Sequence, residues 1–204
     1  MPSFCVTLYC MGVSYFGFNA GSALAADGIA ASAFVATHVA TAAGALAWMG
    51  VEWGYRGKPT MLGAASGAVA GLVAITPAAG FVGPVSAIWI GLGGGIVCYL
   101  GVFLKNKMGY DDALDVLGIH GIGGTWGALA TGLFASVGGG TGLFFGNPGQ
   151  VLIQAIGVGA TWVFAFVGTL VILKFVDALV GLRVSKEEEI IGLDLSQHSE
   201  RAYG

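Results

Sequence analysis

Charged residues are scarce in this sequence of 204 residues, and this scarcity limits the kinds of protein it can be. Asp, Glu, Lys and Arg make up 9% of the chain, with 8 basic and 11 acidic residues, whereas a soluble domain has about 25%. No basic patch is present, so we expect no nucleic-acid partner. Hydrophobic residues make up 56% of the chain, and the mean hydropathy is +0.84. This composition predicts an all-α, multi-spanning membrane protein.

Cysteine is also rare, and Cys5, Cys10 and Cys98 all lie in apolar stretches. Their spacings give neither a disulfide framework nor a metal site, so we interpret them as thiols of the core. The sequence shows no nucleophile–base pair and no cluster of metal ligands, so we expect no enzyme activity, no metal and no cofactor. Residues 1–13 lack the positively charged start and the cleavage site of a signal peptide.

Six apolar segments each approach or exceed the ~20 residues that cross a bilayer. They are residues 4–24, 28–53, 60–82, 85–104, 112–135 and 149–182. The sequence therefore predicts a polytopic helix bundle over residues 1–184 and a polar tail over 185–204. We expect Asp111 and Asp112 to cap the fifth segment, with Asp115 in its first turn, where a negative charge suits the helix dipole.

Glycine is abundant, with 37 residues, which suits closely packed membrane helices. Gly63, Gly67 and Gly71 recur at a spacing of four in the third segment and predict a seam for tight helix contact. Pro77 lies near the end of the same segment, and we expect the helix to bend or end there.

Lys and Arg are confined to one side of the predicted topology. They occur only in the second and fourth connections and from the end of the sixth segment onward. The positive-inside rule makes this side cytoplasmic, which predicts two cytoplasmic termini in a cell-membrane protein. The connection 136–146 has no charge, is rich in glycine, and is expected to form a flexible external loop.

The fifth segment carries a histidine, His120, near its middle. His120, Gly124, Gly127 and Thr131 recur at helical spacing and are expected to share one face. An ionisable side chain at membrane depth normally faces a cavity, a partner or a pathway. From this helix alone, a pathway histidine and a histidine hydrogen-bonded inside the bundle are equally good interpretations.

The first segment contains YFGFNAGSAL, in which Phe18 and Ser22 share a face with Tyr15 one turn earlier. An aromatic ring beside a hydroxyl can hold a small cation. The more common alternative is ordinary packing of Phe18, with the Ser22 hydroxyl bonded to the carbonyl four residues earlier. The second segment contains His38, which we interpret as a packed, neutral histidine bonded to a neighbouring helix.

Four segments of the chain, in order and at matching spacing, resemble the ammonium transporter (Amt/Mep/Rh) family. They are YFGFNAGSAL (15–24), EWGYRGKPTMLGAASGAVAGLVAITPAAGFVGP (52–84), DDALDVLGIHGIGGTWGALATGLFA (111–135) and VGLRVSKEEEIIGLDLSQHSERAY (180–203). The resemblance covers nearly the whole chain from about residue 11. It strongly favours the pathway interpretation of His120.

The resemblance implies a subunit of eleven helices, built from two inverted five-helix halves and a long final helix, with a pore between the halves. This chain is similar to the second half and the final helix. By resemblance, Phe18 is a gate phenylalanine, Ser22 recruits ammonium, and His120 is the second of two pore histidines. Asp115 matches an acidic residue for which we expect a structural role at the inner end, and His38 matches neither pore histidine.

The predicted function is therefore transmembrane transport of ammonium or ammonia by a chain that corresponds to part of a transporter. The first pore histidine belongs to the half that the sequence does not match, so we expect the chain alone to conduct ammonium poorly. It is expected to contact lipid and to form a homotrimer or associate with a first-half or full-length subunit. The alternative is a non-conducting fragment or a regulatory or assembly subunit that associates with full-length transporters.

The tail, RVSKEEEIIGLDLSQHSERAYG, is charged but more patterned than a disordered tail needs to be. We expect it to dock on the cytoplasmic face and to couple subunits in a trimer. The resemblance also implies that a PII-type signalling protein meets bacterial members of the family there.

Overall fold

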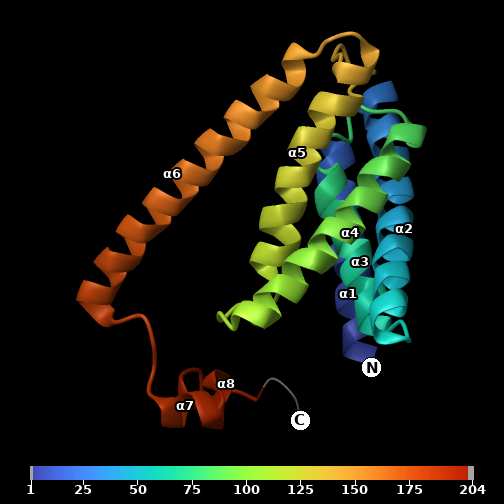
Figure 1. Ribbon diagram of the computed structural model, residues 1–204. Helices are drawn as coiled ribbons and strands as arrows, with labels where there is room; N and C mark the ends of the chain where they lie inside the picture. The colour runs from blue at the N-terminus through green and yellow to red at the C-terminus, as the bar shows by residue number, and fades with distance from the viewer. Residues whose placement is uncertain (1, 202–204) are drawn as a thin grey trace. The chain divides into compact units, whose positions relative to one another are not determined.

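The computed structural model describes residues 2–201, with side chains from residue 11 onward. The helices are α1 (Pro2–Gly21), α2 (Gly28–Arg56), α3 (Met61–Ile75), α4 (Pro84–Met108), the π-helix η1 (Leu117–Gly121), α5 (Ile122–Phe134), the 3-10 helix η2 (Leu143–Phe145), α6 (Gly149–Val180), α7 (Lys186–Ile191) and α8 (Leu193–Ser196). No strand occurs among the described residues, and the all-α prediction is confirmed. The chain forms two compact units, 1–158 and 159–204, and each is described by itself (Figure 1).

Each of the six predicted segments contains one principal helix, α1 to α6. Within the described residues, α2, α4 and α6 are long and apolar enough to cross a membrane, and α3 is a shorter apolar helix. Cys98 lies buried on α4, as expected of a core thiol, whereas the side chains of Cys5 and Cys10 lie outside the described residues.

The core of the first unit lies where α2, α3 and α4 meet. Ala36, Ala40, Ala74 and Ile90 have no exposed surface. Gly44 lets the helix backbones touch, because a Cβ added there would lie 2.6 Å from the carbonyl oxygen of Gly67 and 2.7 Å from the Cα of Gly71. The predicted glycine seam of α3 is confirmed, since Gly63, Gly67 and Gly71 would all clash with atoms of α2 if they carried a side chain.

The connection between α2 and α3 is fixed by a buried carboxylate. Glu52, on the last turns of α2, is 3% exposed. Its Oε2 accepts a hydrogen bond of 3.0 Å from the Thr60 backbone N–H, and Thr60 Oγ1 lies 3.1 Å from Oε1. Thr60 in turn caps α3 by accepting a 2.8 Å bond from the Gly63 N–H. The end of one helix therefore holds the cap of the next.

The third helix is shorter than the predicted segment 60–82, because α3 ends at Ile75. Thr76 still has α-helical backbone angles, but Pro77 lacks the N–H that would continue the helical hydrogen bonds. Residues 76–81 form turns instead, with the Ala78 N–H bonded to the Ile75 carbonyl at 2.8 Å. The expectation that the helix bends or ends at Pro77 is confirmed.

The fifth helix begins later than predicted. Asp112 does act as a cap, since its carboxylate oxygens accept bonds of 2.9 and 3.0 Å from the N–H groups of Val116 and Leu117. Asp115, however, does not lie in the first helical turn. It precedes the helix with a φ of 54°, a left-handed conformation that Asp tolerates better than most residues. The prediction was wrong because the capping loop uses three more residues than a simple N-cap.

The connections of the first unit lie at two opposite ends (Figure 1). The α2–α3 connection and the α4–η1 connection share one end with the start of α1, and residues 76–83 and 135–148 lie at the other. The two basic connections of this unit therefore share an end, as the charge pattern predicts.

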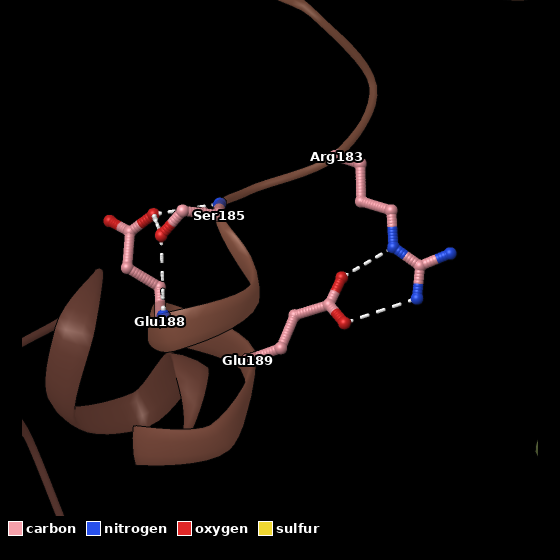
Figure 2. Close-up of polar contacts among 4 residues, drawn as sticks. All are labelled: Arg183, Ser185, Glu188 and Glu189. Carbon is pink, nitrogen blue, oxygen red and sulfur yellow. Dashed lines mark hydrogen bonds and ion pairs between the residues drawn. The ribbon is translucent and has the colours of Figure 1, made fainter.

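The second unit contains a tail that is folded on itself. Ser185 and Glu188 form a capping box at the start of α7, in which the Glu188 Oε2 accepts bonds of 3.0 and 2.8 Å from the Ser185 N–H and hydroxyl. Arg183 donates from Nε and Nη2 to the two carboxylate oxygens of Glu189, at 2.5 and 3.1 Å (Figure 2). Gln197 of the α8 end donates to Glu188 at 2.8 Å, which joins the two short helices.

Candidate functional site

His120 lies in the one π-helical turn of the described residues, η1. A π-turn adds a residue to the ordinary helical repeat and is often found at functional sites. The ring of His120 is exposed, although its neighbours Gly118 and Ile119 are buried. The turn thus places the imidazole outside the packed core of the first unit.

An ion pair fixes the backbone that leads into this turn. Lys105, near the end of α4, contacts the Asp115 carboxylate and donates a 2.9 Å bond to the Asp112 carbonyl. The Ile119 N–H is bonded to the Asp115 carbonyl at 2.8 Å. The charge on α4 therefore holds the loop from which η1 begins.

The His120 ring touches the first helix. The Tyr15 hydroxyl lies 3.2 Å from Nε2 of His120, across 105 residues of sequence. No other hydrogen bond of the imidazole is formed within the described residues. This contact brings together two of the segments that the sequence singled out.

Phe18 lies one turn further along α1 than Tyr15, and Ser22 follows directly after the end of α1, with its N–H bonded to the Phe18 carbonyl at 3.0 Å. Both line a pocket of about 290 Å³ together with residues of the α3–α4 connection. That connection lies at one end of the first unit (Figure 1). Other lining residues come from α1, α2 and three connections: Asn19, Ala23, Ile29, Ala33, Thr76, Ala79, Gly80, Phe81 and Gly138. Phe18 is 64% exposed, so its ring is not part of the packed core.

The loop over this pocket is held by one carbonyl. The Phe81 carbonyl accepts bonds of 2.8 Å from the Ser136 N–H and 3.1 Å from the Val137 N–H. Gly138 has a φ of 65°, and a Cβ there would lie 2.5 Å from the Gly80 carbonyl oxygen. Only glycine meets both requirements, so this part of the predicted flexible loop has a defined geometry.

The Ser22 hydroxyl donates a 2.6 Å bond to the Phe18 carbonyl. This is the ordinary back-bonding alternative for a helical serine. The hydroxyl oxygen keeps its acceptor capacity in this arrangement, and Ser22 remains exposed at the pocket.

The predicted stripe on the fifth helix divides into two parts. Gly127 packs against the Ala74 carbonyl and Pro77, and Thr131 is buried with its hydroxyl bonded to the Gly127 carbonyl at 2.8 Å. A Cβ added at Gly124 would meet no atom within 4 Å. His120 is therefore exposed and Gly124 is open, whereas Gly127 packs against α3 and Thr131 is buried.

His38 differs from the prediction. Its ring packs near Phe16 of α1, with centroids 5.9 Å apart, but it is exposed and makes no hydrogen bond to a described residue. The expected bond to a neighbouring helix is therefore not formed within the described part of the chain.

The structure also identifies a polar contact that the sequence reasoning missed. Asn19 is 6% exposed and donates from Nδ2 to Thr37 Oγ1 at 3.0 Å, while Thr37 donates to the Ala33 carbonyl at 2.7 Å. The only indication of this contact in the sequence is that Asn19 is a polar residue next to Phe18 in an apolar segment. Asn19 ties α1 to α2 behind the pocket.

Comparisons with known proteins agree with these observations. Residues 8–203 match the Ammonium Transporter Family. The chain is 57% identical over 194 residues to an ammonium transporter of Bacillus subtilis (strain 168), covering 93% of this chain and 48% of that protein. It is 53% identical over 191 residues to ammonium transporter Amt1 of Archaeoglobus fulgidus, covering 93% of this chain and 49% of that protein.

Solved structures show the same partial match. The crystal structure of Candida albicans Mep2 superposes with a TM-score of 0.85 at 33% identity, covering 96% of this chain and 46% of that one. A structure described as a sensor Amt protein gives a TM-score of 0.87 at 28% identity, covering 96% and 49%. The chain thus spans about half the length of the relatives that it matches, and those named here as curated relatives are transporters rather than enzymes.

Proposed function

We propose that this chain, which belongs to the ammonium transporter family, supplies one half of a pathway that carries ammonium or ammonia across a membrane. The observation that carries the proposal is the arrangement of Tyr15 and Phe18 one turn apart on α1, with Ser22 directly after the end of that helix. This arrangement leads from the pocket to His120.

The chemistry of these residues suits a small hydrated cation that must lose its water. An aromatic ring and a hydroxyl can replace part of the hydration shell of ammonium, which favours Phe18 and Ser22 as the first contact. A neutral imidazole further in can accept a hydrogen bond from the substrate or relay a proton. Asp115 acts at the inner end as a structural residue, through its pair with Lys105.

The exposed state of the pathway residues supports a second half. His120 and Phe18 are both exposed within this chain, and a polar imidazole exposed to hydrocarbon is unfavourable. The relatives are about twice as long as the part that this chain matches. A segment equivalent to the remainder of those relatives would cover these residues and complete the pathway.

The test is transport with and without that complement. The chain is expressed in a strain that lacks ammonium uptake, alone and together with the first half of a full-length relative. We expect growth at low ammonium only from the combination. His120→Ala should abolish this growth, whereas His38→Ala, as a matched control on another exposed histidine, should not. Growth from the chain alone that depends on His120 would contradict the half-pathway proposal.

The alternative is a non-conducting regulatory or assembly subunit. The match to only part of each relative supports this alternative, because such a subunit needs no whole pathway of its own. In the same strain, a regulatory or assembly role predicts no growth when the chain is combined with the first half of any full-length relative. It also predicts co-purification of the chain with a full-length transporter. The two functions therefore give opposite results in one experiment.

The proposed location is the plasma or inner membrane of the cell. The proposed orientation places both termini in the cytoplasm. All Lys and Arg residues lie on the side that would then be cytoplasmic. Reporter fusions at Gly138 and Gly204 should report opposite sides of the membrane. The same side for both would rule out this topology.

We propose a homotrimer or an association with other family subunits, with the tail docked on the cytoplasmic face. The folded α7–α8 segment supports docking, because its ion pair and capping box give it a definite surface. Deletion of residues 185–204 should reduce assembly or transport. A PII-type protein is the proposed soluble partner in a bacterial cell, and pull-down with and without the tail tests it.

A further inference from the structure

The contact between Tyr15 and His120 constrains the imidazole more than its distance alone suggests. Tyr15 is half-buried on α1 and His120 is exposed on η1, so the bond joins two elements that are far apart in sequence. Its heavy-atom distance is 3.2 Å from the hydroxyl oxygen to Nε2, within the range of a hydrogen bond although longer than the shortest ones. The ring is held from one side only.

The direction of the bond follows from the chemistry of the two groups. A phenol hydroxyl is both a donor and an acceptor, and a neutral imidazole has one donor nitrogen and one acceptor nitrogen. The phenol oxygen is the weaker acceptor of the pair, since its lone pair is delocalised into the ring, whereas the bare imidazole nitrogen accepts strongly. The stable arrangement therefore has the Tyr15 O–H donating to Nε2.

We propose that Tyr15 is a positioning residue that holds neutral His120 in the tautomer with its proton on Nδ1. A hydrogen bond at one ring nitrogen decides which nitrogen carries the proton. With Nε2 accepting from Tyr15, the proton lies on Nδ1, and Nδ1 is the nitrogen that can donate to a further group. For its role in transport this inference rests on the proposed function, although the tautomer itself does not.

Two consequences follow for the proposed pathway. A group from the complementary half that meets His120 at Nδ1 must present an acceptor. A substrate that donates a hydrogen bond to His120 must take Nε2 from Tyr15. If His120 gains a proton, Tyr15 can rotate its hydroxyl and accept from Nε2–H without moving the ring. Tyr15 can thus remain bonded to both protonation states of the histidine.

No neighbouring group among the described residues is placed to replace the Tyr15 hydroxyl as a partner of His120. Within the described residues, no other side-chain hydroxyl is bonded to the His120 ring. Gly124 lies one turn beyond His120 and brings no side chain. Removing the single oxygen atom of Tyr15 therefore removes the constraint while leaving the aromatic ring.

The test reads the tautomer directly. The full chain is labelled with ¹⁵N at histidine and placed in lipid bilayers, and the ring nitrogen signals are recorded at a pH where the histidines are neutral. His120→Ala identifies the His120 signals among the three histidines. We expect wild-type His120 to show a protonated Nδ1 and a bare Nε2. Tyr15→Phe should move the population toward the Nε2–H form.

Tyr55→Phe is the matched control. Tyr55 is exposed and its ring stacks edge-on with Phe103, so loss of its hydroxyl should leave the His120 signals unchanged. Helix content by circular dichroism shows whether each variant is folded. Should Tyr15→Phe fail to fold, the wild-type spectrum alone still decides. A wild-type His120 protonated at Nε2, or a folded Tyr15→Phe with unchanged signals, would overturn the proposal.

Transport distinguishes this proposal from the proposed function. In the combination with a first half, Tyr15→Phe should change the uptake rate less than His120→Ala does. Uptake that is absent from every combination, with the expected tautomer present, would remove the proposed function and leave the positioning role of Tyr15 intact.

Discussion

The first unit contains two regions of opposite construction. The seam between α2, α3 and α4 is closed by this chain alone, because Gly44, Gly71 and Gly91 bring the backbones into direct contact. The proposed pathway face, made of Tyr15 and Phe18 on α1, Ser22 directly after it, and His120, is open, and its side chains are exposed or half-buried. The comparison teaches that the chain packs its own scaffold closely and leaves this second surface uncovered by the described residues.

The largest expected effect comes from filling the seam. Gly44→Ala places a Cβ 2.6 Å from the Gly67 carbonyl oxygen, and the contact is with backbone that cannot rotate away. Overpacking of this kind lowers the free energy of unfolding by about 1–3 kcal/mol. Thermal unfolding in detergent, followed by circular dichroism, measures the loss.

Gly54→Ala is the control on the same helix. A Cβ there would meet no atom within 4 Å, and alanine favours a helix over glycine by about 1 kcal/mol. The control should therefore be neutral or more stable than wild type. Equal losses for the two variants would show that the seam is not closely packed.

A second effect of similar size is expected at the end of the seam. Glu52→Ala removes the buried carboxylate that accepts from the Thr60 N–H and hydroxyl, and a hydrogen bond to a charged group contributes about 1.5–3 kcal/mol. Arg56→Ala, which removes an exposed partner at 3.7 Å, should cost less than about 1 kcal/mol. Unfolding midpoints that rank these two variants in the reverse order would contradict the assigned role of Glu52.

Much of this scaffold was predictable from the sequence, because its causes are local. The spacing of Gly63, Gly67 and Gly71 predicts close contact, and Pro77 predicts where α3 ends. Asp112 predicts a cap, but not how many residues the loop uses before the helix begins. The late start depends on Lys105, which reaches Asp115 from another helix.

The proposed pathway face was only partly predictable. Phe18, Ser22 and His120 were identified by helical spacing and by family resemblance. Helical spacing missed the π-turn, because one extra residue in a turn leaves no mark in a periodic pattern. The contact of Tyr15 with His120 spans 105 residues, and a single sequence carries no signal for a pair of that separation.

A smaller effect should come from the ion pair that links the two regions. Lys105→Met removes the contact with Asp115 and the bond to the Asp112 carbonyl, which frees the loop before η1. We expect a partial loss of uptake in the combination with a first half, smaller than that of His120→Ala. Lys107→Met, which removes a neighbouring positive charge, is the control and should retain uptake. Full uptake in Lys105→Met would show that the open face does not depend on this support.

The smallest effect is expected in the tail, where the groups are exposed. The Ser185 hydroxyl and N–H hold the pKa of Glu188 below its usual range, and the hydrogen bond from Arg183 does the same for the pKa of Glu189. A lowered carboxyl pKa means that the stabilisation is present above the ordinary carboxyl pKa. It is lost as the pH falls through the lowered value.

Hydrogen exchange of the α7 amides, corrected for the intrinsic rate at each pH, tests this. Protection should be constant near neutral pH and should fall on acidification below the ordinary carboxyl range. Arg183→Gln should reduce the protection at neutral pH and flatten its dependence on pH. Protection that rises on acidification would have the wrong sign for both carboxylates.

The pocket has a consequence for how the protein is made. Its lining residues extend along the chain from Phe18 to Gly138, whereas the glycine seam uses only residues of α2, α3 and α4. A chain that leaves the ribosome from its N-terminus therefore has the whole seam before the residues that close the pocket. Contacts between distant residues also form late in folding, because their loops are costly to close. We therefore expect the nascent protein to assemble its scaffold first and this pocket last, when Ser136 and Val137 reach the Phe81 carbonyl.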